Sequence, residues 1–259
     1  MTTNNLYSNY NALQVTWART KGRYTVDFNY TYGKALGILN GWDQFNLNND
    51  YGVLAANRTH VFNVAYSLEL GNLTKDKVAG GFANGWQISG VTQIQSGANL
   101  SANSGNGNFG MNLNGYTIPG TKYNVTNVSI LGTNDIQLQP VLTCNPTSNL
   151  GSHQYVNPNC FAIPTTGSNG PTVLPAIYGP AFFNSNLALF KNFKFREKMN
   201  LQVRAEGYNF LNHPLWSFNG NGLSLGFDPT TGKVNTPNFG TVTQKQGNRV
   251  IQLTVKFLF

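Results

Sequence analysis

The chain has 259 residues with a formal net charge of +8, and only 10% of its residues are charged while 13% are aromatic. Ordinary soluble domains carry roughly a quarter charged residues, so this balance favours a membrane barrel with an apolar exterior and a lumen lined by amides and hydroxyls. The sequence contains no run of about 18 apolar residues, which excludes a membrane-spanning helix.

Alternation of apolar and polar residues predicts an all-β, antiparallel transmembrane β-barrel segment of about seven to eight strands. The clearest alternation places Tyr24, Val26 and Phe28 on one face and Thr25 and Asp27 on the other. The predicted strands lie near residues 10–18, 23–33, 59–70, 86–96, 184–191, 199–211 and 249–259. Three long polar loops connect some of them, at residues 34–57, 97–179 and 212–247.

The last predicted strand has one apolar face and one polar face. Its apolar face consists of Ile251, Leu253, Val255, Phe257 and Phe259. Its length matches the roughly 9 to 11 residues that a tilted strand needs to cross a bilayer. The alternation and the terminal Phe resemble the insertion signal of Gram-negative outer-membrane barrels. The closing strand of a soluble β-sandwich is the alternative for this segment.

Long and short connections should alternate around a barrel. If Phe259 is periplasmic, the three long loops lie outside, and the turns near 19–22, 71–85 and 192–198 lie inside. These turns and their edges hold nine of the 17 Lys and Arg residues: Arg19, Lys21, Arg23, Lys75, Lys77, Lys191, Lys194, Arg196 and Lys198. This distribution predicts anchoring near phospholipid headgroups and argues against nucleic-acid binding. The odd strand count predicts either a further strand near 6–10 or the C-terminal part of a larger barrel.

Several sequence blocks together resemble the C-terminal barrel region of Oar-like TonB-dependent transporters, which are abundant in acidobacteria. The most specific block is Arg-Ala-Glu-Gly-Tyr-Asn-Phe-Leu-Asn-His-Pro at 204–214, followed by the terminal Phe. The other blocks lie at residues 10–14, 50–52, 58–62, 85–90, 159–161, 179–184 and 189–193. The resemblance implies a plugged barrel of about 22 strands, built behind a carboxypeptidase-regulatory-like domain. The sequence departs from this pattern, because it shows no signal peptide, no TonB-contacting box and no plug.

The resemblance implies a receptor that takes part in energised uptake of a bulky nutrient, either a carbohydrate or a peptide, across the outer membrane. Its expected partners are outer-membrane lipid, the barrel assembly machinery and TonB, the last only through an N-terminal plug. A non-energised, porin-like barrel built from several chains is one alternative, and a soluble β-sandwich carbohydrate-binding module is another. We expect no enzymatic activity and no cofactor.

Few residues are candidates for a site. Cys144 and Cys160 form an even pair in one predicted outer loop, which predicts a disulfide worth about 3 kcal/mol through loop-closure entropy. Four charged residues fall on polar strand faces and are predicted to line the lumen: Asp27, Glu69, Arg204 and Glu206.

Two other patterns have simpler explanations. Gly105, Gly107 and Gly110 match the dinucleotide pattern Gly-x-Gly-x-x-Gly, but no strand precedes them and no helix follows, so we predict a flexible loop. The three histidines, His60, His153 and His213, are far apart and lack nearby carboxylates, so we predict no metal or catalytic site.

Overall fold

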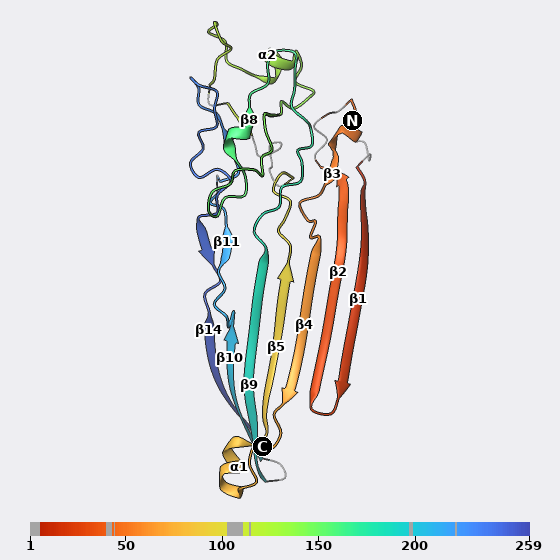
Figure 1. Ribbon diagram of the computed structural model, residues 1–259, viewed down its shortest axis with the longest axis vertical. Coiled ribbons are helices and arrows are strands. Elements are labelled where there is room, and N and C mark those ends of the chain that lie inside the picture. Colours follow the sequence, from red (N-terminus) through yellow and green to blue (C-terminus); the bar gives the residue numbers. More distant parts are fainter. Residues whose placement is uncertain are drawn as a thin grey trace.

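A computed structural model describes residues 6–39, 43, 45–102, 111–113, 115–196, 199–220 and 222–259. Its main feature is an antiparallel sheet in the order β1-β2-β4-β5-β9-β10-β14, with the short β3 paired to β2 (Figure 1). The strands are β1 (Ser8–Lys21), β2 (Tyr24–Ile38), β3 (Tyr51–Val53), β4 (His60–Glu69), β5 (Trp86–Gln95), β9 (Phe182–Arg196), β10 (Met199–Tyr208) and β14 (Val250–Leu258). Each long strand pairs with the next one along the chain, so the sheet is an antiparallel meander.

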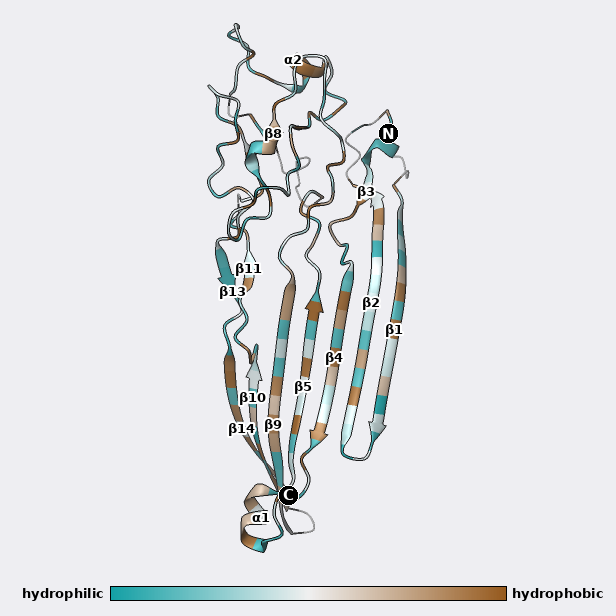
Figure 2. Ribbon diagram, in the orientation of Figure 1, coloured by the Kyte–Doolittle hydropathy of each residue, from teal (hydrophilic) through white to brown (hydrophobic). Residues whose placement is uncertain are grey.

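The pairing register places mostly polar side chains on one face of the sheet and mostly apolar side chains on the other. One row across neighbouring strands consists of Val15, Tyr30, Phe62, Ile94 and Phe183. The next row consists of Thr16, Asn29, Asn63, Gln93 and Asn184. Since side chains alternate along a strand, these rows lie on opposite faces, which we call the apolar face and the polar face. Figure 2 shows this alternation as brown and teal bands along the strands.

Several strand ends differ from the sequence-based expectation. β2 continues to Ile38, so residues 34–38 belong to the strand and not to a loop. β9 continues to Arg196, and the basic turn expected at 192–198 is therefore wrong for residues 192–196. The physical reason is that Asn192 and Phe193 keep pairing with β10. β10 ends at Tyr208 rather than at 211. Ser8 already belongs to β1, so residues 8–10 form no separate strand.

The connections lie at two ends of the sheet (Figure 1). One end, which we call the turn end, carries the turn between β1 and β2 and the connection between β4 and β5. The first of these turns passes through Gly22, whose φ of 66° is the left-handed conformation that glycine adopts without strain. The second contains α1 (Lys77–Ala83), a helix that the alternation of apolar and polar residues does not predict. Within the described part of the chain, no helix combines the length and the apolar character that crossing a membrane requires.

The opposite end carries a compact unit that we call the loop cap, built from the described residues of 97–179 and 209–249. Its short elements are β6 (Met111–Asn112), α2 (Asn127–Leu131), β7 (Val141–Leu142), η2 (Pro158–Cys160), β8 (Phe161–Ala162), β11 (Leu215–Ser217), β12 (Leu225–Gly226) and β13 (Gln244–Gln246). The remaining short helix, η1 (Leu47–Asp50), lies between β2 and β3. β6 pairs with β12, which ties the two long loops together.

The hydrophobic core of the described chain lies in the loop cap and not in the sheet. One cluster of buried residues combines both long loops: Leu100, Val156, Cys160, Phe161, Leu174, Ile177, Leu225, Phe227 and Phe239. A second cluster contains Val125, Ile130 and Leu138. Among described residues, Ile38 at the cap end of β2 is the only buried apolar side chain that belongs to a long strand. The expected long loops are therefore irregular in backbone but packed like a small domain.

Candidate functional site

The polar face of the sheet carries a hollow of about 360 Å³. It extends from β2 to β10, and its polar lining includes Thr25, Asp27, Ser67, Ser89, Asn186, Arg204 and Glu206. Hydroxyl, amide and charged groups of both signs therefore share one concave surface. Such a lining can form hydrogen bonds with a polar ligand or with a polar protein surface.

All four predicted lumen residues fall on this polar face, but they do not form one cluster. Arg204 and Glu206 form an ion pair, with 3.4 Å between the Arg204 Nε and a Glu206 carboxylate oxygen. The guanidinium of Arg204 also lies 5.1 Å from the ring centroid of Phe190. Asp27 lines the same hollow and accepts a hydrogen bond of 2.5 Å from the side chain of Asn29. Glu69 lies apart, in a depression near the turn end that also contains Arg23.

The apolar face exposes large side chains that a soluble protein would bury. The five apolar residues expected as the insertion signal on β14 and at the terminus are all exposed: Ile251, Leu253, Val255, Phe257 and Phe259. Leu13 and Trp17 of β1 and Leu189 of β9 are exposed as well. A continuous apolar surface of this kind needs a nonaqueous neighbour, because soluble monomers rarely expose patches larger than a few hundred Å². For a strand sheet, a lipid bilayer is such a neighbour.

Asn99 joins separate connections at the base of the loop cap. This buried side chain donates a 2.7 Å hydrogen bond to the carbonyl of Val53, the last residue of β3. Its Oδ1 accepts hydrogen bonds from the backbone of Ile177 and from the hydroxyl of Ser101. A buried amide with these partners fixes three chain segments relative to one another. The sequence offers no signal for this role, because Asn99 is one of many asparagines in the loops.

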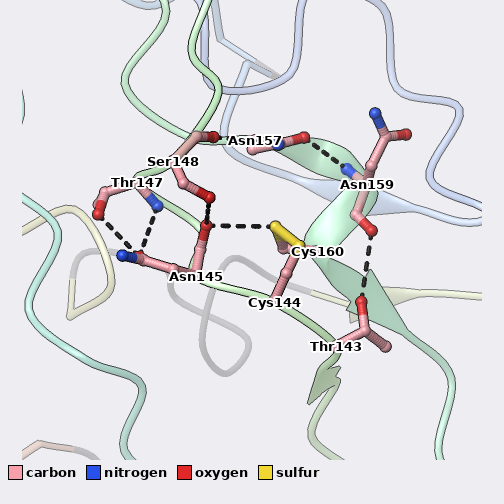
Figure 3. Close-up of a disulfide and its surroundings, with 8 residues drawn as sticks. All are labelled: Thr143, Cys144, Asn145, Thr147, Ser148, Asn157, Asn159 and Cys160. Carbon is pink, nitrogen blue, oxygen red and sulfur yellow. Dashed lines mark hydrogen bonds between the residues drawn. A yellow bond between two sulfur atoms is a disulfide. The ribbon is translucent and has the colours of Figure 1, made fainter.

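A disulfide between Cys144 and Cys160 closes a loop within the cap (Figure 3). Polar turns hold the loop around it. The Oδ1 of Asn145 accepts hydrogen bonds from the backbone and hydroxyl of Thr147, and the Ser148 hydroxyl donates to the Asn145 carbonyl (Figure 3). Cys160 is fully buried and belongs to the main cap cluster, so the crosslink connects this loop directly to the apolar core.

Asn209 shows what the most specific sequence block does physically. It follows β10 with a φ of 46°, a left-handed conformation that asparagine tolerates better than most residues. Its backbone N–H donates to the side chain of Asn186 on β9. Its side chain accepts from the backbone N–H of His213 and donates to the carbonyls of His213 and Gly247. The block therefore closes the turn that leads from the sheet into the cap.

Asp43 organises the connection between β2 and β3. The amide of Asn49 donates to one of its oxygens, and the backbone N–H groups of Phe45 and Asn46 donate to the other. The Asn49 hydrogen bond, helped by the two backbone donors, holds the pKa of Asp43 below its usual value although burial opposes this shift. Asp43 also forms a β-bridge with Ile136, so this turn contacts the cap.

The histidines take structural positions. The Nδ1 of His60 lies 2.8 Å from the hydroxyl of Tyr30, His153 packs against Trp216, and His213 packs against Phe183. Within the described ranges, no three His, Cys, Asp or Glu side chains are placed to hold a metal ion together. The pattern formed by Gly105, Gly107 and Gly110 lies outside the described residues.

The comparisons with known proteins agree with this geometry. A family model described as "Outer membrane beta barrel domain" matches residues 1–252, which is nearly the whole chain. No curated protein matches, and neither does any solved structure. The match explains why an antiparallel sheet has a polar face and an exposed apolar face. The chain therefore belongs to the outer membrane beta barrel domain family.

Proposed function

We propose that this chain is the C-terminal barrel segment of a TonB-dependent outer-membrane receptor, which takes part in energised uptake of a bulky nutrient. The observation that carries the proposal is the direction of the two edge strands. The described part of the chain has seven long antiparallel strands, so β1 and β14 run the same way. Direct closure would pair these edges in parallel, whereas bacterial barrels are antiparallel with an even number of strands. A larger barrel satisfies both edges, as the resemblance to Oar-like transporters implies.

The proposal gives each surface a role. The apolar face contacts lipid, the polar face with Asp27, Glu69, Arg204 and Glu206 lines the lumen, and the loop cap lies outside the cell. The C-terminus is then periplasmic, and a plug from the N-terminal part of the receptor occupies the lumen. TonB acts on this chain only through that plug.

The cap and lumen suit a bulky polar nutrient. Asn, Gly, Ser and Thr dominate the outer loops, and amides and hydroxyls line the hollow on the polar face. Asp27, Arg204 and Glu206 lie beside them, so the hollow offers hydrogen-bond donors and acceptors together with charges of both signs, which fits carbohydrates or peptides. The cap also covers one end of the sheet (Figure 1), so a nutrient would meet the cap before the lumen.

A non-energised barrel assembled from several chains is the second candidate. Its support is that strands from another chain would satisfy the open edges of β1 and β14 equally well. The soluble β-sandwich does not fit, because a sandwich buries its apolar side chains between two sheets, whereas this sheet exposes them.

An immunoblot of native outer membranes tests the first candidate against the second. An antibody against residues 212–247 is applied to samples run unheated and boiled. The receptor predicts one band far above 28.4 kDa, the mass of this chain, with a mobility that changes on boiling. A band at the mass of this chain would contradict the receptor and support the multi-chain barrel.

Conductance of the purified protein in planar lipid bilayers provides the functional test. A plugged receptor should show no steady ion current, because the plug fills the lumen. A porin-like barrel should conduct continuously. Steady conductance by the intact, unmodified protein would therefore count against energised uptake.

A further inference from the structure

The connection between β4 and β5 contains an apolar helix whose C-terminal end is hydrogen-bonded to side chains of the sheet. α1 has the sequence Lys-Val-Ala-Gly-Gly-Phe-Ala and buries none of its residues. Val78 is 76% exposed and Phe82 is 72% exposed, and the preceding Leu73 is 66% exposed. A helix in water would turn such side chains toward a core.

Two side chains of the sheet hold the C-terminal end of α1. The Nζ of Lys191 on β9 donates a 2.5 Å hydrogen bond to the carbonyl of Gly81. The Nε1 of Trp86 on β5 donates a 2.8 Å hydrogen bond to the carbonyl of Phe82. Trp86 and Lys191 are direct partners in the register between β5 and β9, so they lie on the same face.

That face is the apolar face. Along β5 and β9, Trp86 and Lys191 share it with Ile88, Leu189 and Phe193. Lys191 is nonetheless only 4% exposed, and its ammonium lies 4.7 Å from the ring centroid of Phe193. A lysine facing lipid without partners is costly, and α1 removes that cost by supplying a carbonyl acceptor. The C-terminal end of the helix is therefore held at the turn end of the apolar face.

The connection is built to present α1 in one orientation. A helix of seven residues is marginal by itself. Asp76 caps its start by accepting hydrogen bonds from the backbone of Val78 and Ala79. The side chain of Asn84 accepts hydrogen bonds from the backbone of Leu73 and Thr74 and donates to the Thr74 carbonyl, which closes the loop.

We propose that α1 is an interfacial membrane anchor whose exposed apolar side chains insert into the phospholipid leaflet at the turn end of the barrel. Lipid is the expected neighbour of these side chains, because α1 continues the apolar face of the sheet, which contacts lipid. Lys75 and Lys77 are exposed beside the apolar residues, where they can reach headgroup phosphates. Only the assignment of this leaflet to the periplasmic side rests on the proposed function.

Spin labelling of the whole protein in phospholipid nanodiscs tests the anchor. Both native cysteines of this chain form the disulfide, so an introduced cysteine can be labelled selectively with a maleimide nitroxide. Labels are placed by F82C and, as an independent second position, by V78C. L253C on the apolar face is the lipid reference, and K122C on the cap is the water reference.

The expected result is that labels at F82C and V78C collide with oxygen more than with a water-soluble nickel complex, at a depth of about 5–10 Å. Nickel accessibility equal to that of K122C at both positions, with L253C still in lipid, would overturn the anchor and leave the barrel intact. An aqueous label at L253C would overturn the anchor together with the lipid-facing assignment on which it depends. Neither outcome involves transport, so failure of the proposed uptake remains distinguishable.

Discussion

In the sheet, Leu253 is 78% exposed, whereas in the loop cap Phe227 is fully buried. Both are large apolar residues of one chain, and they differ in the medium that surrounds their part of the molecule. A strand in a bilayer turns apolar side chains outward, while a loop in water turns them inward. Burial within the protein is therefore the wrong measure of a core for the sheet, because lipid completes its packing.

The two regions also satisfy their backbone groups differently. Between the edge strands β1 and β14, each long strand pairs with a neighbour on both sides, as a bilayer requires of any chain that crosses it. The cap has few β-ladders, and side chains satisfy some of its backbone groups instead. Backbone N–H groups donate hydrogen bonds to the side chains of Asn99, Asn145 and Asn157. The frequent asparagines of the cap therefore have a structural role.

The largest expected effect comes from Phe227→Ala in the cap core. Removing a buried Phe side chain should cost about 3 to 5 kcal/mol of cap stability, through lost burial and a residual cavity. Hydrogen exchange of the whole protein in nanodiscs should show faster exchange in the cap and unchanged exchange in β4, β5 and β9. Leu253→Ala is the matched control and should leave the cap unaffected. Faster hydrogen exchange in the sheet of F227A would show that the two regions unfold together and would contradict their independent stabilisation.

Leu253→Arg tests whether the apolar face contacts lipid. An arginine on that face should cost about 2 to 4 kcal/mol at the bilayer midplane and less toward the interfaces. Gln252→Arg is the matched control, because the neighbouring residue faces the other way and its partner in the register is Glu206. The folded fraction, read from unheated gels after assembly in vesicles, should fall for L253R and stay near wild type for Q252R. Equal losses would contradict the assignment of the two faces.

Removing the disulfide should loosen the cap alone. The double substitution C144S/C160S releases a loop closed by residues 16 apart, and the entropy of that closure corresponds to up to about 3 kcal/mol. Hydrogen exchange near residues 144–160 should accelerate, and mild reduction of the wild-type protein should reproduce this change. Exchange in the loop that matches the oxidised wild type would show that the apolar core alone holds the cap together.

The strands were predictable because alternation is a local signal. The local alternation at Tyr24, Val26 and Phe28 predicts β2 without information about distant residues. The core of the cap had no such signal, because Val156, Phe161 and Phe227 stand singly among Gly, Asn and Pro. They meet only after the chain has formed two long loops, so their contacts are not readable from spacing.

The candidate site was also predictable only in its local features and not in its contacts between distant residues. The alternation places Arg204 and Glu206 on one polar face, but it does not reveal their ion pair or the separate position of Glu69. α1 escaped prediction because Gly80 and Gly81 lower its helix propensity, although Asp76 offered a capping signal. The role of Lys191 was hidden for another reason, since its partner carbonyl lies 110 residues away in sequence.

The smallest expected effect concerns Asp43 and depends on pH. Because its folded pKa is lowered, the carboxylate stabilises its turn above the unfolded value of 3.8, and this contribution disappears as the pH falls through the folded pKa. Asp43→Asn exchanges one acceptor oxygen for an amide that cannot accept from Asn49, so it should cost on the order of 1 kcal/mol at neutral pH. Limited proteolysis of the 45–57 connection should show a difference between D43N and wild type at pH 7 that narrows below about pH 3.8. A difference in proteolysis that persists unchanged in acid would mean that Asp43 acts through its shape and not through its charge. Unchanged proteolysis of the sheet at both pH values would show that the effect is confined to the part of the molecule in water.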